Sequence, residues 1–132
     1  MRKRLDVQDV ALVMLGSALG GMARYAVSGF VARRVGEAFP WGTMAVNVSG
    51  AFAIGLIAAA ATSGAFAGPS AWRLAVVGFL GSYTTVSSFS LQTLALVRDG
   101  EWASAAFNIA GSLAVCLGAA GLGLLAGMRV VS

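Results

Sequence analysis

The chain carries the stretch Thr84–Ser90, of sequence Thr-Thr-Val-Ser-Ser-Phe-Ser, inside an otherwise apolar run from Trp72 to Val97. That run is long enough to cross a bilayer, because about 20 helical residues span roughly 30 Å of hydrocarbon. Each hydroxyl and each freed backbone group there needs a partner, since the hydrocarbon holds no bulk water. Polar groups at that depth usually line a path or bind something. We therefore expect function to reside in this stretch.

The composition is that of a membrane protein. Of the 132 residues, 58% are hydrophobic and only 11% are charged, against about 25% charged in an ordinary soluble domain. Four apolar runs take up nearly the whole chain: residues 10–32, 41–62, 72–97 and 102–128. We predict an all-α membrane protein in which residues 1–132 form a single transmembrane domain of four helices.

The residue types that are missing narrow the function. No histidine occurs and Cys116 is the only cysteine, so imidazole metal sites and internal disulfides are excluded. Without a histidine or a buried carboxylate there is no nucleophile–base pair, and we do not expect an enzyme. The one basic cluster, Arg2–Arg4, fits anionic lipid headgroups better than it fits nucleic acid.

All the acidic residues lie outside the four predicted spans; they are Asp6, Asp9, Glu37, Asp99 and Glu101. Proton-driven exporters of this size depend on a carboxylate within the membrane, and cation pores favour carboxylate rings. Donors from asparagine, threonine and serine are left in place. The pattern therefore favours an anion or a neutral solute.

The charges bias the orientation only weakly. With four spans, the N-terminus, the second loop and the C-terminus share one side, which carries five basic residues against three on the other. Such a chain can insert both ways, and two oppositely inserted copies can pair about a two-fold axis in the membrane plane. Alternatively, Arg2–Arg4 alone holds one orientation. The charges leave both interpretations open.

Two polar residues in the first half of the chain each have two interpretations. Asn47 follows Thr43 by one helical turn, on the same face of the second span. Its amide either makes an interhelical hydrogen bond, worth about 0.6–2 kcal/mol, or offers N–H donors to an anion. Arg24 lies well inside the first span, where it either anchors the helix structurally or attracts an anion.

Polar residues also recur every four positions along the fourth span: Ser104, Asn108, Ser112 and Cys116. On a helix they form one narrow stripe. With the second span and the hydroxyl run, the stripe makes three polar surfaces, which favours a polar track through the protein. Paired glycines, Gly16 with Gly20 and Gly123 with Gly127, have the spacing that lets membrane helices pack closely.

The third span combines glycines with clustered hydroxyls near its middle, between Gly78 and Ser90. Both features weaken helix continuity, so we expect a break in this helix. A break frees backbone carbonyls, which coordinate small cations, whereas helix N-termini and hydroxyls receive anions.

Three ordered motifs resemble the Fluc (CrcB) family of fluoride channels. They are Gly20-Gly21-Met22-Ala23-Arg24-Tyr25, the segment from Trp41 to Gly50, and the segment from Gly78 to Ser90. The resemblance covers nearly the full chain in length and in the order of the spans. It implies a fluoride-selective channel of the bacterial inner membrane, through which cytoplasmic fluoride leaves passively down its electrochemical gradient, reducing fluoride toxicity.

The resemblance also implies an assembly, namely an antiparallel, dual-topology homodimer with two fluoride pores, embedded in membrane lipid. That arrangement would explain the weak charge bias. A structural sodium ion is implied at the dimer centre, held by the backbone carbonyls of Gly81 and Thr84 from each subunit.

For the pore, the family's asparagine corresponds to Asn47 and its second phenylalanine to Phe89. Ring edges carry partial positive charge and can face an anion. Fluoride holds its water strongly, so a pore must replace those hydrogen bonds with its own. The candidate donors are the Asn47 amide and the hydroxyls of Thr43, Ser88 and Ser112, with Asn108 as a further member of the track.

The chain departs from the family pattern at three positions. Val86 stands where the family usually has its first phenylalanine, Ser88 replaces a threonine, and Asn108 stands where an aromatic residue is often found. The serine keeps a hydroxyl, whereas the valine removes one of the expected pore rings. We still expect fluoride transport, with conductance or selectivity as the properties that Val86 would alter.

Three other interpretations stay open. A conduction-impaired subunit of a heterodimeric fluoride channel is made plausible by Val86. A small multidrug-type exporter shares the four-span design but needs the intramembrane acid that is missing here. A purely structural membrane subunit explains the glycine pairs and leaves the polar stripes without a role.

Overall fold

The computed structural model describes residues 4–66 and 68–132, and every regular element among them is a helix. The helices are α1 (Val7–Val35), α2 (Trp41–Thr62), α3 (Gly68–Trp72), η1 (Arg73–Leu80), α4 (Gly81–Tyr83), α5 (Val86–Arg98) and α6 (Trp102–Val131). Among these described residues, four helical segments are long and apolar enough to cross a membrane, the third of them being Gly68–Arg98. The prediction of an all-α chain with four such segments is confirmed. Arg2 and Lys3 of the basic cluster lie outside the described residues.

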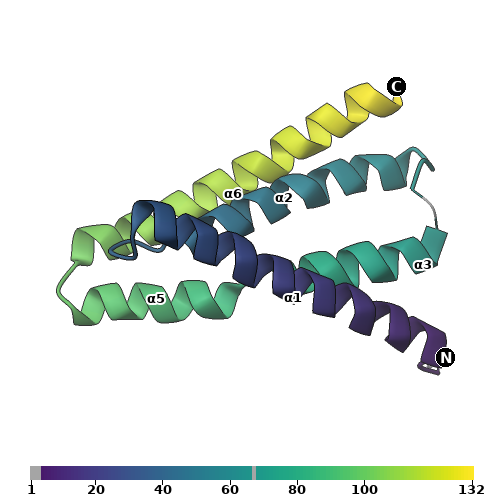
Figure 1. The fold of residues 1–132 in the computed structure, drawn as a ribbon. Coiled ribbons are helices and arrows are strands. Elements are labelled where there is room, and N and C mark those ends of the chain that lie inside the picture. The colour runs from purple at the N-terminus through teal and green to yellow at the C-terminus, as the bar shows by residue number, and fades with distance from the viewer. Residues whose placement is uncertain (1–3, 67) are drawn as a thin grey trace.

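The helices run back and forth between two ends of a bundle (Figure 1). The N-terminus, the α2–α3 connection and the C-terminus lie at one end, and the α1–α2 and α5–α6 connections lie at the other. α2 and α6 lie side by side and share the largest helix–helix interface. α1 packs against η1, α4 and α2, whereas α5 packs mainly against α6.

The first helix begins earlier than the apolar pattern indicates. Asp6 adopts extended dihedral angles and its carboxylate accepts the Gln8 N–H at 3.1 Å, which caps α1. Asp9 therefore lies in the first turn of α1, where a negative charge favours the helix dipole. The helix α1 is thus longer at both ends than the predicted span 10–32, and Asp9 lies in the N-terminal extension. At the other end α1 stops at Gly36, whose φ of 86° suits glycine.

Close contacts at glycines join α1 to the first half of the third span. A Cβ at Gly16 would overlap the carbonyl oxygen of Leu74, and a Cβ at Gly20 would overlap that of Phe79. The same holds between α2 and α6, where a Cβ at Gly123 would overlap the Phe52 carbonyl oxygen. The glycine pairs thus bring helix backbones into direct contact, as their spacing predicts.

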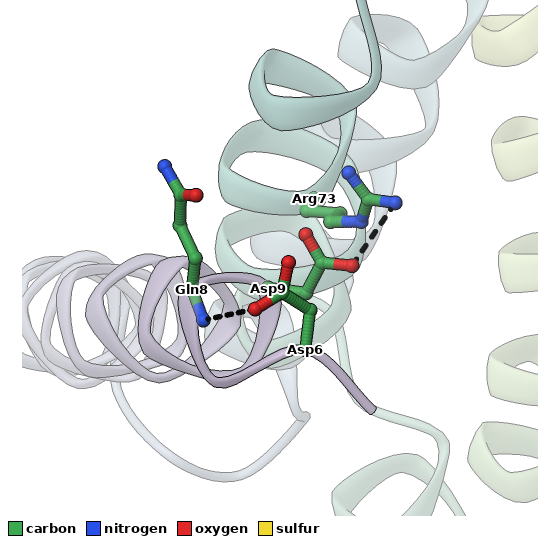
Figure 2. A network of polar contacts seen from close by, with 4 residues as sticks. All are labelled: Asp6, Gln8, Asp9 and Arg73. Carbon is green, nitrogen blue, oxygen red and sulfur yellow. Dashed lines mark hydrogen bonds and ion pairs between the residues drawn. The ribbon is translucent and has the colours of Figure 1, made fainter. Parts of the chain in front are cut away.

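An ion pair fastens the start of this half-span to the start of α1. The Arg73 guanidinium lies 3.1 Å from the Asp9 carboxylate, and both side chains are about one-third exposed. Figure 2 shows the pair beside the Asp6 cap of α1. From Arg73 to Leu80 the backbone is a π-helix, and it continues into α4. π-helical turns often lie at functional sites.

The helical backbone stops at Tyr83 and starts again at Val86. Thr84 and Thr85 between them have ψ angles of 157° and 120°, in the extended region. The two threonines lie within the hydroxyl run that the sequence singles out. α4 and α5 therefore present one helix C-terminus and one helix N-terminus close to each other.

Candidate functional site

A cavity of about 920 Å³ lies between α1, α2 and α5. It reaches from Thr85, where the helical backbone is interrupted, to the α1–α2 connection and the end of α5. Its wall contains seven residues with cationic, hydroxyl or amide side chains: Arg24, Tyr25, Ser28, Thr43, Thr85, Ser88 and Gln92. Three of the predicted site residues, Arg24, Thr43 and Ser88, thus border one space.

Asn47 lies one helical turn beyond Thr43 and binds the backbone of Thr85. Its Nδ2 donates to the Thr85 carbonyl at 2.9 Å, and the Thr85 N–H donates to its Oδ1 at 2.7 Å. The amide therefore satisfies both polar groups of a residue that has left the helix. Of the two interpretations, the interhelical bond is present. One N–H of Nδ2 remains, because the amide has two donors.

The interruption removes the helical partners of the four carbonyl groups from residue 81 to residue 84, and Gly81 and Thr84 supply two of them. In a continuous helix the Gly81 carbonyl would accept the N–H of Thr85, and the Thr84 carbonyl that of Ser88. Here the Thr85 N–H donates to Asn47 Oδ1 instead. The Ser88 N–H donates to the Thr85 hydroxyl at 3.2 Å, and this bond caps α5. Gly81 itself is exposed and Thr84 is half-buried.

These two carbonyls are the ones predicted to hold sodium. Carbonyls at unwound backbone and at half-helix C-termini are suitable ligands for a sodium ion. The donor set therefore fits the ion, with two oxygens available from one chain. Thr84 is held in place by its hydroxyl, which donates to the Leu80 carbonyl at 3.0 Å.

Among the described residues, Arg24 is the only one in the cavity wall with a cationic side chain. Within those residues its guanidinium makes no ion pair, and its backbone carbonyl accepts the Ser28 hydroxyl at 2.7 Å. Glu37 and Asp99 also line the cavity. They lie in the connection after α1 and just after α5, so they border the end of the cavity that is remote from Thr85.

A second polar cluster joins α5 to α6. Asn108 is only 1% exposed, and its Nδ2 donates to the Thr93 hydroxyl at 2.9 Å. Ser112 donates to Asn108 Oδ1 at 3.3 Å, and Thr93 donates to the Phe89 carbonyl at 2.7 Å. Within residues 4–66 and 68–132, no hydrogen bond joins this cluster to the one at Asn47. Continuity of the predicted polar track thus stays a prediction.

Comparisons with known proteins identify the family of this chain. The family model described as CrcB-like protein, Camphor Resistance (CrcB), matches residues 11–124. The chain belongs to the CrcB-like family. Its membership confirms the resemblance seen in the sequence motifs.

Individual relatives in this family match nearly the whole chain. A protein of Rhodopseudomonas palustris named fluoride-specific ion channel FluC 2 is 60% identical over 122 residues, which cover 91% of this chain and 93% of the relative. A protein of the same name from Bradyrhizobium diazoefficiens is 58% identical over 121 residues, with 90% and 88% covered. One from Opitutus terrae, named fluoride-specific ion channel FluC, is 48% identical, with 91% and 92% covered. With its four long apolar helices, this CrcB-like chain is a multi-pass membrane protein.

The aromatic residues of the CrcB-like motif take different positions. Phe89 is half-buried on α5, one helical turn before Thr93, and it does not border the cavity. The Val86 side chain is 77% exposed and does not border the cavity. Phe79 and Tyr83 stack on each other with ring centroids 5.8 Å apart, and the Tyr83 hydroxyl lies 2.9 Å from that of Ser49. Neither ring lines the cavity.

Sequence reasoning missed two residues of α5. Gln92 lines the cavity, and its Oε1 is buried without a hydrogen-bond partner among the described residues. Thr93 is the hydroxyl that binds Asn108. A signal for Gln92 was present, because it follows Ser88 by one helical turn. The polar run appeared to end at Ser90, where the apolar residues resume.

Proposed function

We propose that this protein is a fluoride-selective channel. The names of its CrcB-like relatives support this function. The observation that carries it in this chain is the cavity between α1, α2 and α5, whose wall includes hydroxyl and amide side chains together with Arg24. Its acidic residues lie at helix ends or in connections, so the inner part of the cavity has donors without carboxylates.

The cavity can replace the water around a small anion step by step. The Arg24 charge raises the local anion concentration, and the positive end of the α5 dipole lies at Thr85 and Ser88. Hydroxyls of Thr43 and Ser88 and the N–H groups of Gln92 are donors that can face the ion. Glu37 and Asp99 repel an entering anion less than carboxylates deeper in the cavity would, because charges at the solvent end are screened by salt.

Asn47 contributes by shaping this site as well as by donating to the ion. Its two hydrogen bonds hold Thr85 in extended conformation, and Thr85 in turn caps the N-terminus of α5. Its remaining N–H is available to a passing anion. Phe89, Ser112 and Asn108 are proposed for a deeper section of the path, where the Phe89 ring edge can face the ion.

We propose that two copies assemble antiparallel and that the interruption at Thr84–Thr85 is the functional break of the third transmembrane helix. The freed carbonyls of Gly81 and Thr84 support a structural sodium ion shared between the copies. When bound, the ion would neutralise carbonyl dipoles at the centre of the dimer. The weak charge bias supports insertion in both orientations. In the bacterial inner membrane, such a channel would let cytoplasmic fluoride leave down its electrochemical gradient.

Reconstitution tests the proposal. Liposomes that contain the purified protein and either potassium fluoride or potassium chloride are diluted, and valinomycin carries the compensating potassium. We expect rapid release of fluoride and retention of chloride, measured with ion-selective electrodes. Equal release of both anions would contradict the proposal.

A second reconstitution experiment tests whether the chain is instead a conduction-impaired subunit of a heterodimeric fluoride channel. Val86 is exposed and outside the cavity wall, so we expect this chain to conduct without a second family member. Silence of this chain alone, with fluoride release after co-reconstitution with a CrcB-like relative, would instead support a conduction-impaired subunit. Silence in both arms would contradict channel function.

A further inference from the structure

The half-helix α5 is attached to the rest of the chain at few points. Its buried residues are Thr93 and Leu96. Large apolar residues on its other side, Leu91 and Leu94, are 71% and 65% exposed. Beyond its N-cap at Thr85, the polar contact of Thr93 is therefore the main specific link between α5 and the bundle.

That link is a series of hydrogen bonds in which each side chain donates to the next residue. Ser112 donates to Asn108, Asn108 donates to Thr93, and Thr93 donates to the Phe89 carbonyl. Thr93 and Asn108 are 7% and 1% exposed. Side chains this deeply buried have almost no surface on which water could replace a lost partner, so the loss leaves a buried polar group unsatisfied. The structure therefore requires the Thr93 hydroxyl both as the acceptor for Asn108 and as the donor to the Phe89 carbonyl.

The position of Thr93 on α5 determines which residues meet the cavity. Successive residues of a helix are turned by about 100°, so Thr93 and Gln92 point in different directions. While Thr93 binds α6, the neighbouring stripe of Ser88 and Gln92 borders the cavity. A rotation of α5 by one residue would move this stripe away from the cavity and would break the Thr93–Asn108 bond.

We propose that Thr93 is a positioning residue of the conduction path, which acts through Asn108 to set the rotation of α5. It holds the donors Ser88 and Gln92 at the cavity, without touching the ion itself. The inference rests on the proposed fluoride channel function. It gives Asn108, which departs from the family pattern, a role as the partner of Thr93.

The test compares Thr93→Val, which has nearly the same shape without the hydroxyl, with Thr93→Ser, which keeps the hydroxyl. Ser90→Ala is the matched control, because Ser90 is exposed on the same helix. Among the described residues its hydroxyl donates only to the Val86 carbonyl, one turn earlier in α5. Fluoride and chloride release per folded protein are measured in liposomes, and thermal unfolding is measured in detergent. Thr93→Ala replaces Thr93→Val if the valine variant does not assemble.

We expect Thr93→Val to slow fluoride release about tenfold, or about 1.4 kcal/mol, and to reduce the preference for fluoride over chloride. Thr93→Ser should stay within about twofold of the unsubstituted protein, as should Ser90→Ala. Asn108→Leu should resemble Thr93→Val, and the double variant should be no slower than the slower single variant, because both act in one unit.

Two results would overturn the inference. If Thr93→Val lowers thermal stability but leaves flux and selectivity per folded protein unchanged, the residue is only structural. If Thr93→Ser is as impaired as Thr93→Val, the hydroxyl is not the positioning group. Failure of the unsubstituted protein to release fluoride is a separate result, which overturns the proposed function and this inference with it.

Discussion

The two halves of the third span are held in contrasting ways. The first half, Gly68–Tyr83, lies with its backbone directly against Gly16 and Gly20 of α1 and is fastened by the Asp9–Arg73 ion pair. The second half, α5, is held by two asparagines, Asn47 at its cap and Asn108 at Thr93, and borders the cavity. Close packing thus fixes one half, and hydrogen bonds fix the other.

The contrast separates scaffold from site. Backbone contact at glycines leaves no room for an ion or for water, so the first half suits a rigid support. Polar contacts position α5 and at the same time leave donors and open space beside it. The interruption at Thr84–Thr85 permits this difference, because it lets the two halves take independent rotations.

The largest expected effect comes from removing a glycine of the scaffold. Gly20→Leu would drive a side chain into the Phe79 carbonyl, which is backbone and cannot move aside. We expect a loss of at least about 3 kcal/mol, at the upper end for overpacking, and little assembled protein in size-exclusion chromatography. Gly21→Ala is the control, since a Cβ there meets nothing within 4 Å. Normal assembly of Gly20→Leu would disprove the close contact.

A smaller effect is expected at the polar attachment of α5. Asn47→Asp loses the donor to the Thr85 carbonyl and places negative charge beside the path. We expect fluoride release to fall about tenfold or more, with a loss of about 1–3 kcal/mol in stability. Ser49→Ala, on the same helix, should leave fluoride release unchanged. An Asn47→Asp variant with normal fluoride release would remove Asn47 from the conducting region.

The smallest effect is expected at the ion pair of the scaffold. Asp9→Asn removes the charge that faces Arg73, and partly exposed pairs contribute about 0–1 kcal/mol. Thermal unfolding should shift slightly and fluoride flux per folded protein should not change. Asp99→Asn, whose pair with Arg98 is mostly exposed, is the stability control. A large loss of flux from Asp9→Asn would show that the first half does more than support.

Much of the scaffold was predictable because it depends on composition and spacing. The apolar runs located the four long helices, and the glycine pairs predicted the close contacts of α1 and α6. The π-helix Arg73–Leu80 carries no local signal of its own. It lies where η1 packs on Gly16 and Gly20, so its register depends on a neighbour that is distant in sequence.

The site was predictable in its residue types but not in its hydrogen bonds. Thr43 and Ser88 were expected in a path, whereas Arg24 was given either a structural or an anion-attracting role, and all three line the same cavity. The pairing of Asn47 with the Thr85 backbone depends on how α2 meets α5, which no spacing within either segment reveals. Thr93 was missed for the same reason, since its importance comes from Asn108 on another helix.

The most direct test of the central claim compares two serines of α5. In a Cys116→Ser background, Ser88→Cys lines the cavity and Ser90→Cys points away from it. Both variants are treated with a negatively charged methanethiosulfonate reagent, and fluoride release is then measured. We expect modification to stop release in Ser88→Cys and to leave Ser90→Cys unaffected. Undiminished release from fully labelled Ser88→Cys would contradict the assignment of this face of α5 to the path.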